Sequence, residues 1–347
     1  MALGIVFHDS FSHYTTSDFL LKWSAYDFSP FILSTAGPRG AGALAADQSN
    51  DRIQKSLPAS DKWCVCVRMK RDGASNNQAG YFLYLGDSGS DQCGLYLEVD
   101  GKVSFYRGTT SLATSTASIP LDQWTWVAFK VTIHDTTGAY EVRLNNTNVL
   151  SASSVDTKNT ANTTADTLYV QGRAGGFGGP TVNGGNARVL YADLVVMQGA
   201  NADFISDAKV NYYPPNGNGN YSQMTGSDGN SVDNYLLVDE ATPNADTDYN
   251  ESSTVGNKDS YAATNISDTP STIYAVSPIV TMKKDDAGSR SAATLLRSGT
   301  TDQDGATHTL GVSYAMYQDI YEVDPNTSAA WTLANANASE PGFKVIA

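Results

Sequence analysis

The chain has 347 residues, 17% of them charged and 41% hydrophobic, with a formal net charge of −14 at pH 7. This composition predicts a folded protein, and the length allows about two domains. Because an acidic chain repels phosphate backbones, we expect no nucleic-acid partner. No run reaches the roughly 18 apolar residues of a membrane-spanning helix, so we expect no membrane insertion.

The charge is distributed unevenly along the chain. Residues 1–208 carry 15 basic and 19 acidic side chains, a net charge of −4, whereas residues 209–347 carry 7 and 17, a net charge of −10. Two adjacent prolines followed by Asn-Gly repeats lie at this change and are typical of a linker. We therefore predict a domain at 1–208, a Pro/Gly/Asn-rich linker at 209–222 and an acidic domain at 223–347.

Short apolar segments separated by Gly, Asn and Asp turns dominate the first domain, and helical periodicity is almost absent. The Asp100-Gly101 pair between two such segments is a strong hairpin signal. This pattern predicts an antiparallel β-sandwich. In chain order, the expected strands lie at 63–70, 80–85, 95–99, 103–106, 122–133, 139–144, 168–170 and 189–197.

A second set of β segments follows the predicted linker, and it indicates a smaller C-terminal β-sandwich. Its expected strands lie at 234–239, 272–283, 292–297, 308–317, 320–323 and 342–346.

The N-terminus has no basic residues before its short apolar run, so the sequence does not predict a secretory signal. Synthesis in a cytoplasm is the resulting expectation. Cys64 and Cys66 share one face of an expected strand with Cα atoms roughly 6.5–7 Å apart, at or beyond the usual limit for a disulfide. We expect free thiols.

Several features of residues 1–200 resemble the concanavalin A-like jelly roll, especially its laminin-G-like and pentraxin-like branch. They are Asp9-Ser10-Phe11, the turn from Pro120 to Trp124, the segment 140–145 and the closing segment 192–196. The resemblance implies an all-β fold: a concanavalin A-like jelly roll followed by the smaller sandwich.

Several C-terminal segments are similar to a region of tailed-bacteriophage structural proteins. They are 238–240, 246–249, 259–261, 284–290, 297–299, 324–327, 330–332 and 342–345. This resemblance implies a component of a virion, made in the cytoplasm of a host bacterium, and no particular chemistry.

Catalytic patterns are weak in this sequence, so we expect no enzyme activity. Glycosidases of this fold carry paired carboxylates on one strand face. The nearest match is Glu98-Val99-Asp100, whose Asp100 belongs to the hairpin turn. The four histidines, His8, His13, His134 and His308, stand in no nucleophile motif.

Ligand sites are suggested by two features. The Gly-rich loop after residue 171 offers Arg173, Phe177, Asn183 and Asn186 for binding a glycan. Laminin-G relatives often hold calcium between loops, and Asp156, Asp166 and Asp193 are acids near loops. We expect no obligatory cofactor and name no definite calcium ligands.

Our leading hypothesis is a non-enzymatic structural component of a tailed-phage virion, in the neck, the tail or the capsid surface. Its partners would be other virion proteins and further copies of itself, because exposed sheet edges need a neighbour. The alternative is a module that binds host-surface glycans. A glycoside hydrolase ranks third.

Overall fold

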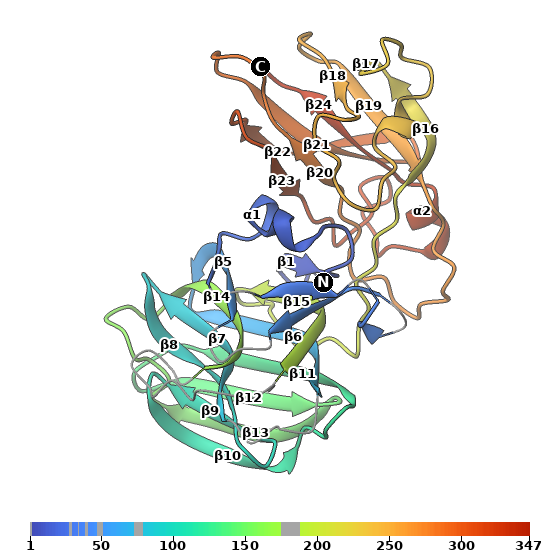
Figure 1. Ribbon diagram of the computed structural model, residues 1–347. Coiled ribbons are helices and arrows are strands. Elements are labelled where there is room, and N and C mark those ends of the chain that lie inside the picture. Colours follow the sequence, from blue (N-terminus) through green and yellow to red (C-terminus); the bar gives the residue numbers. More distant parts are fainter. Residues whose placement is uncertain are drawn as a thin grey trace. The chain divides into compact units, whose positions relative to one another are not determined.

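The computed structural model describes residues 2–27, 30–33, 35–38, 41–46, 51–72, 79–174 and 188–347. The chain divides into two compact units, Leu3–Asn211 and Tyr212–Ala347. Both consist mainly of antiparallel strands, which confirms the all-β expectation (Figure 1). No helix in the described ranges is long and apolar enough to span a membrane.

The first unit is a jelly-roll sandwich of two sheets. Among the described residues, sheet A has eight strands in the order β13-β12-β11-β6-β15-β4-β3, with β1 also paired to β15. Its strands are β1 (Ile5–Asp9), β3 (Phe31–Leu33), β4 (Ala43–Ala46), β6 (Lys62–Asp72), β11 (Trp124–Thr132), β12 (Gly138–Leu144), β13 (Thr147–Val155) and β15 (Arg188–Gln198).

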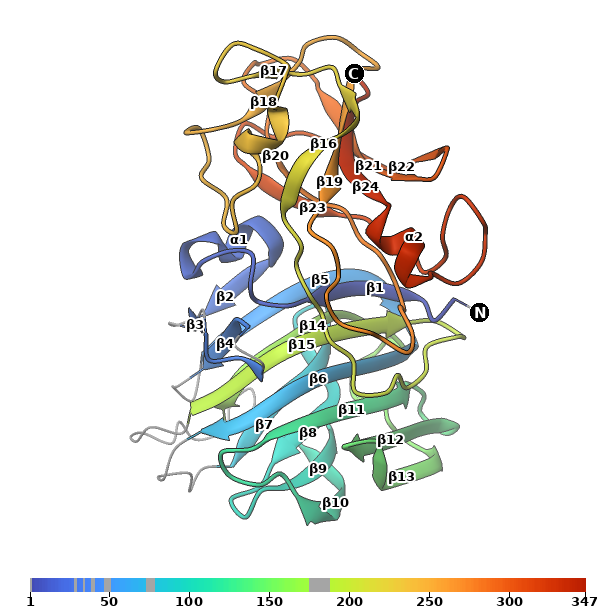
Figure 2. The ribbon, with the colours of Figure 1, turned by 90° about the vertical axis from the view of Figure 1, so that its right-hand side faces the viewer.

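Sheet B, within the same described ranges, has seven strands in the order β10-β9-β8-β7-β14-β5-β2. Figure 2 shows β6, β11 and β15 of sheet A in front of β7, β8 and β9 of sheet B. The strands of sheet B are β2 (Ala25–Asp27), β5 (Arg52–Ser60), β7 (Gly80–Asp87), β8 (Ser90–Leu97), β9 (Lys102–Arg107), β10 (Thr110–Ser118) and β14 (Ala165–Ala174).

The hydrophobic core lies between these two sheets. Phe105 of sheet B stacks on Tyr140 of sheet A with ring centroids 4.2 Å apart, and it lies 6.4 Å from Phe129. Trp63 and Phe82 are also completely buried. Every second side chain of a strand points into the sandwich, which explains the alternation of apolar and polar residues along the strands of the sequence.

A short helical segment connects β1 and β2. It contains the 3₁₀ turn η1 (Thr16–Asp18) and the helix α1 (Phe19–Lys22). Elsewhere in this unit, all three cysteines are buried free thiols, as expected, and the Sγ atoms of Cys64 and Cys66 lie 4.0 Å apart.

The second unit is built around sheet C, whose described strands follow the order β16-β19-β24-β21-β22. They are β16 (Pro215–Ser222), β19 (Lys258–Ala263), β24 (Glu340–Val345), β21 (Ser291–Ser298) and β22 (Thr301–Thr309). Two strand pairs and two short helices complete it: β17 (Thr225–Gly226) with β18 (Asn250–Glu251), β20 (Ile279–Met282) with β23 (Ala315–Gln318), η3 (Asn234–Leu237) and α2 (Leu333–Asn337).

One predicted boundary needs correction. Residues 215–222 were expected in the linker, but they form β16, which pairs with β19. Pro215 is tolerated because it is the first residue of an edge strand, where its missing N–H removes no ladder bond. The Asn-Gly repeats that suggested a flexible connection belong to this edge strand.

Candidate functional site

Five tyrosines gather on the outer face of sheet B. Phe105 faces sheet A, so its neighbour Tyr106 points the other way. The strand register aligns Tyr169 with Tyr84, Tyr84 with Gly94 and Gly94 with Tyr106. We call this surface the tyrosine face, and it consists of Tyr81, Tyr84, Tyr96, Tyr106 and Tyr169.

The rings of the tyrosine face pack against one another. Tyr84 and Tyr169 are stacked, with centroids 4.6 Å apart and planes 10° apart. Tyr96 and Tyr106 lie 4.8 Å apart, and Tyr81 contacts three of the other rings edge-on at 5.1–5.9 Å. Such offset and edge-to-face arrangements stabilise each pair by roughly 0.5–1.5 kcal/mol beyond burial. The rings of the tyrosine face therefore form a rigid surface.

Gly94 makes this close packing possible. A Cβ atom at this position would lie 2.3 Å from the Cβ of Tyr84, closer than two carbon atoms can approach. A larger residue would push Tyr84 away from the sheet. Gly94 thus has a packing role in the centre of the tyrosine face.

The phenol hydroxyls differ in their partners. The Tyr81 hydroxyl donates to the carbonyl of Gly108 at 2.6 Å, and the Tyr84 hydroxyl lies 3.3 Å from Nη1 of Arg52. The hydroxyls of Tyr96, Tyr106 and Tyr169 have no hydrogen-bond partner within the structure described. Burial of these residues is unequal: Tyr81, Tyr84 and Tyr169 are 4–6% exposed, whereas Tyr96 and Tyr106 are partly exposed.

All the titration shifts on this face keep the phenols protonated. Burial, reinforced by the Asp91 carboxylate, raises the pKa values of Tyr81 and Tyr84 far above the ordinary value. Burial also raises the pKa values of Tyr96 and Tyr169. These four phenols are neutral near pH 7, so they can donate hydrogen bonds but cannot act as general bases.

Arg52 lies beside the tyrosine face, on β5. Its Nε donates to Oδ2 of Asp27 at 2.8 Å, and its Nη2 donates to the same oxygen. Its guanidinium carbon lies 5.0 Å from the centroid of the Tyr169 ring. The guanidinium therefore packs against the tyrosine face, and Asp27 neutralises the charge of the guanidinium.

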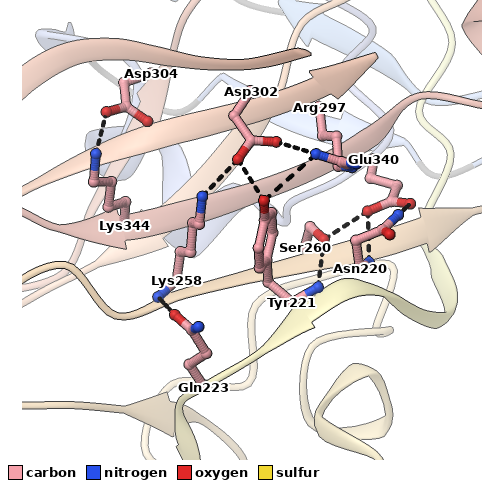
Figure 3. A network of polar contacts seen from close by, with 10 residues as sticks. All are labelled: Asn220, Tyr221, Gln223, Lys258, Ser260, Arg297, Asp302, Asp304, Glu340 and Lys344. Atoms are coloured by element: carbon pink, nitrogen blue, oxygen red, sulfur yellow. Dashed lines mark hydrogen bonds and ion pairs between the residues drawn. The ribbon is translucent and has the colours of Figure 1, made fainter. Parts of the chain in front are cut away.

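The second unit carries a polar network on one face of sheet C (Figure 3). Asp302 accepts hydrogen bonds from Tyr221 at 2.7 Å and from Lys258 and Arg297 at 2.5 Å each. Burial alone would raise the pKa of Asp302, but these three donors lower it to about 2. Other pairs extend the network: Glu340 with Ser260 and Asn220, Lys344 with Asp304, and the Lys258 amide with Gln223.

This network is largely self-contained. Its three cations balance its three anions in number: Lys258 and Arg297 pair with Asp302, Lys344 pairs with Asp304, and Glu340 accepts from Ser260 and Asn220. A face whose charges already pair internally offers little attraction to a charged ligand. We therefore interpret it as a stabilising feature of sheet C.

The sequence-based glycan candidates cannot be assembled into a site. Arg173 belongs to β14, whereas Phe177, Asn183 and Asn186 lie outside the described residues. The tyrosine face was missed because its residues were interpreted only as strand or core positions. A signal was present: tyrosines recur in four neighbouring strands that the hairpin pattern brings together.

The acids considered for calcium are each engaged elsewhere. Asp156 pairs with Arg107, Asp193 lies 3.1 Å from Nε of Arg68, and Asp166 accepts from the amide of Ser88 at 3.2 Å. No group of three or more His, Cys, Asp or Glu side chains that could hold a metal was found in the described part of the chain.

The histidines include one buried network. His13 contacts the hydroxyl of Ser10 through Nδ1 and Nζ of Lys22 through Nε2, at 3.2 Å each. Ser10, His13 and Lys22 are only 3–4% exposed. In these contacts the second ring nitrogen of His13 faces an ammonium rather than a carboxylate, so the pair lacks the third member of a catalytic triad.

Comparison with known proteins gave structural matches only. No protein-family model and no curated protein matches the sequence. An alginate lyase from Aplysia kurodai matches 49% of this chain and 87% of its own, with 11% identity and a TM-score of 0.39. An endo-β-1,4-glucuronan lyase from Trichoderma reesei matches 56% and 96%, with 13% identity and a TM-score of 0.41. A Trypanosoma rangeli sialidase matches 50% and 28%, with 13% identity and a TM-score of 0.35.

These matches correct two expectations. We expected a non-enzymatic virion component, but the structures found are polysaccharide lyases and sialidases, and those reported above include no virion protein. The expectation that the chain has no enzyme activity is contradicted for the same reason. At these low identities and TM-scores, the likeness transfers no substrate and no catalytic residue. The expected virion partners, self-association and location are tested by none of the comparisons.

Proposed function

We propose that this chain binds carbohydrate on the tyrosine face of its first unit. The observation that carries the proposal is the combination of packed aromatic rings with three phenol hydroxyls, those of Tyr96, Tyr106 and Tyr169, that have no partner in the described structure. A sugar presents both an apolar C–H surface and a set of hydroxyls. Aromatic rings pack against the first, and neutral phenols form hydrogen bonds with the second.

Rigidity supports the same proposal. Binding costs less when the side chains are already held in one arrangement. The tyrosine face is held in one arrangement before a ligand binds. Three features hold it: the stacked rings, the close packing at Gly94 and the hydrogen bond from Tyr81 to Gly108. The polar network of sheet C is a weaker candidate because five of its six charged groups already form ion pairs with one another, and Glu340 is bonded to Ser260 and Asn220.

The test is a glycan-array screen with the full chain, followed by titration of the best ligand. Tyr106→Phe and Tyr169→Phe each remove one hydroxyl and keep the ring. Each should weaken binding about 3- to 10-fold, the value of one hydrogen bond. The matched control is Tyr317→Phe, in β23 of the second unit, which should leave the dissociation constant unchanged.

Two results would overturn the proposal: no ligand on the array, or full affinity in both tyrosine variants. The same mixtures are then assayed for new reducing ends. This second measurement determines whether binding is followed by cleavage of the chain that is bound.

A further inference from the structure

Charged groups of both signs act on the tyrosine face. Arg52 is the cation that contacts it, with the guanidinium carbon 5.0 Å from the centroid of Tyr169. Besides burial, the carboxylates of Asp91, Asp166 and Asp27 raise the pKa of Tyr169. Glu98, which acts on Tyr96, also interacts with Lys102.

Arg52 is already engaged. Two nitrogens of Arg52 donate to one oxygen of Asp27, and a third nitrogen lies 3.3 Å from the Tyr84 hydroxyl. The Arg52 side chain is 22% exposed and that of Asp27 is 44% exposed, so this pair lies at the border of the face. An acidic sugar would have to displace Asp27 to form the usual two-bond contact between a carboxylate and arginine.

We infer that the tyrosine face selects uncharged carbohydrates over acidic ones, and that Asp27 sets this selectivity by occupying Arg52. The inference rests on the proposed carbohydrate binding and adds its substrate class. Rejection follows because Arg52, the cation that contacts the described part of this face, is held by Asp27 and is not available to compensate the carboxylate of the ligand. Asp27 acts through Arg52, so it is a specificity-determining residue rather than a direct contact.

The experiment measures one ratio, the dissociation constant for acidic oligosaccharides divided by that for neutral ones. The probes are hexasaccharides of neutral β-glucan, xylan and mannan, compared with hexasaccharides of polyuronates. For the native chain the ratio should exceed about 10. In Asp27→Asn, which keeps the shape but removes the charge, the ratio should fall about 10-fold. This change corresponds to about 1.4 kcal/mol, within the range of one charge-assisted contact.

The matched control is Asp156→Asn. This change also removes the carboxylate partner of an arginine, Arg107, whose guanidinium forms no hydrogen bond or cation–π contact with the five tyrosines in the described structure. The ratio should stay at the native value in this variant. If Asp27→Asn does not fold, the native chain still tests the inference, because added salt screens the repulsion between the Asp27 carboxylate and that of the ligand. Raising NaCl from about 0.05 to 0.5 M should then lower the ratio.

Each outcome supports or overturns the inference, and the two proposals fail in different ways. A native chain that binds acidic sugars as well as neutral ones overturns the selectivity but keeps the proposed function. An unchanged ratio in a folded Asp27→Asn variant overturns the role of Asp27. A native chain that binds neither class overturns both proposals.

Discussion

At the scale of the residue, Asp9 shows how one buried charge can be accommodated. It is fully buried, and its carboxylate accepts from Tyr14 at 2.6 Å, from Trp23 Nε1 at 2.9 Å and from the Phe11 amide at 2.9 Å. Lys22 lies 3.3 Å away. Burial alone would raise the pKa of Asp9, but these contacts lower it. The Asp9-Ser10-Phe11 motif therefore has a physical reason, since it places a fully satisfied carboxylate at the end of β1.

The same cluster should make the first unit sensitive to acid. Burial, followed by the positive charge of Lys22, lowers the pKa values of His8 and His13 from 6.5 to about 3. Between these values the unfolded state binds protons that the folded state does not. The contribution of these histidines to the free energy of unfolding should therefore be fully present above pH 6.5. It should fall as the pH drops toward 3, by on the order of 1 kcal/mol per pH unit for each histidine.

Denaturant titrations from pH 7 to pH 4, followed by tryptophan fluorescence, measure this slope. Four of the five tryptophans lie in the first unit. His13→Gln should give a shallower slope than the native chain. The control is His134→Gln, whose side chain is 41% exposed, and it should keep the native slope. Equal slopes in all three proteins would contradict the prediction.

At the scale of the element, sheet C shows how side chains stabilise a sheet across its strands. Asp302 of β22 joins Lys258 of β19, Arg297 of β21 and Tyr221 of β16, so that one carboxylate connects four of the five strands (Figure 3). The ammonium of Lys258 also lies 3.8 Å from the centroid of the Tyr221 ring. Leu295, on the same strand as Arg297, is completely buried. The aliphatic stems of the charged residues can cover such apolar surface.

Asp302→Asn should therefore destabilise the second unit by about 1–2 kcal/mol, because two cations lose a shared anion and the side chains are only partly screened by water. Thermal unfolding of the native and variant chains measures the loss. Because folding lowers the pKa of Asp302 to about 2, its contribution is present above pH 3.8 and is lost as the pH falls from 3.8 toward 2.

Asp304→Asn is the matched change for this measurement. In the described structure the carboxylate of Asp304 pairs with Lys344, and the side chain of Asp304 is 38% exposed. The expected loss is below about 1 kcal/mol, as for other surface ion pairs. Equal losses in the two variants would show that the network adds nothing to isolated pairs.

At the scale of the whole molecule, the chain consists of two units, each with its own sheets and buried side chains. The core of the first unit includes Trp63, Phe82 and Phe105, and that of the second includes Tyr261, Leu295 and Leu296. The tyrosine face belongs entirely to the first unit. A unit of about 200 residues with its own core is large enough to fold independently.

Residues 1–211 expressed alone should therefore unfold cooperatively and bind the array-selected carbohydrate with a dissociation constant within about twofold of the full chain. Calorimetry and titration of the two proteins provide the comparison. A soluble, folded fragment without affinity would show that the second unit contributes to the binding site.

The sequence by itself determined the all-β class and most strand positions in the centre of the first unit, but it placed strands at 234–239 and 320–323, where the structure has the 3₁₀ helix η3 and an isolated bridge. Alternation, Asp-Gly turns and the change in net charge are local properties, and they follow from period-two geometry and turn chemistry. It also indicated the free thiols correctly, because an extended strand fixes the spacing of Cys64 and Cys66.

Only the tertiary structure decided where the candidate site lies. Tyr81 and Tyr169 are 88 positions apart, and Asp27 and Arg52 are 25 apart; strand order and register bring such residues to one face. Register depends on which edges pair across the whole sheet, which no local pattern encodes. For the same reason the Asn-Gly repeats, locally typical of a linker, became the edge strand β16 once β19 was available to pair with them.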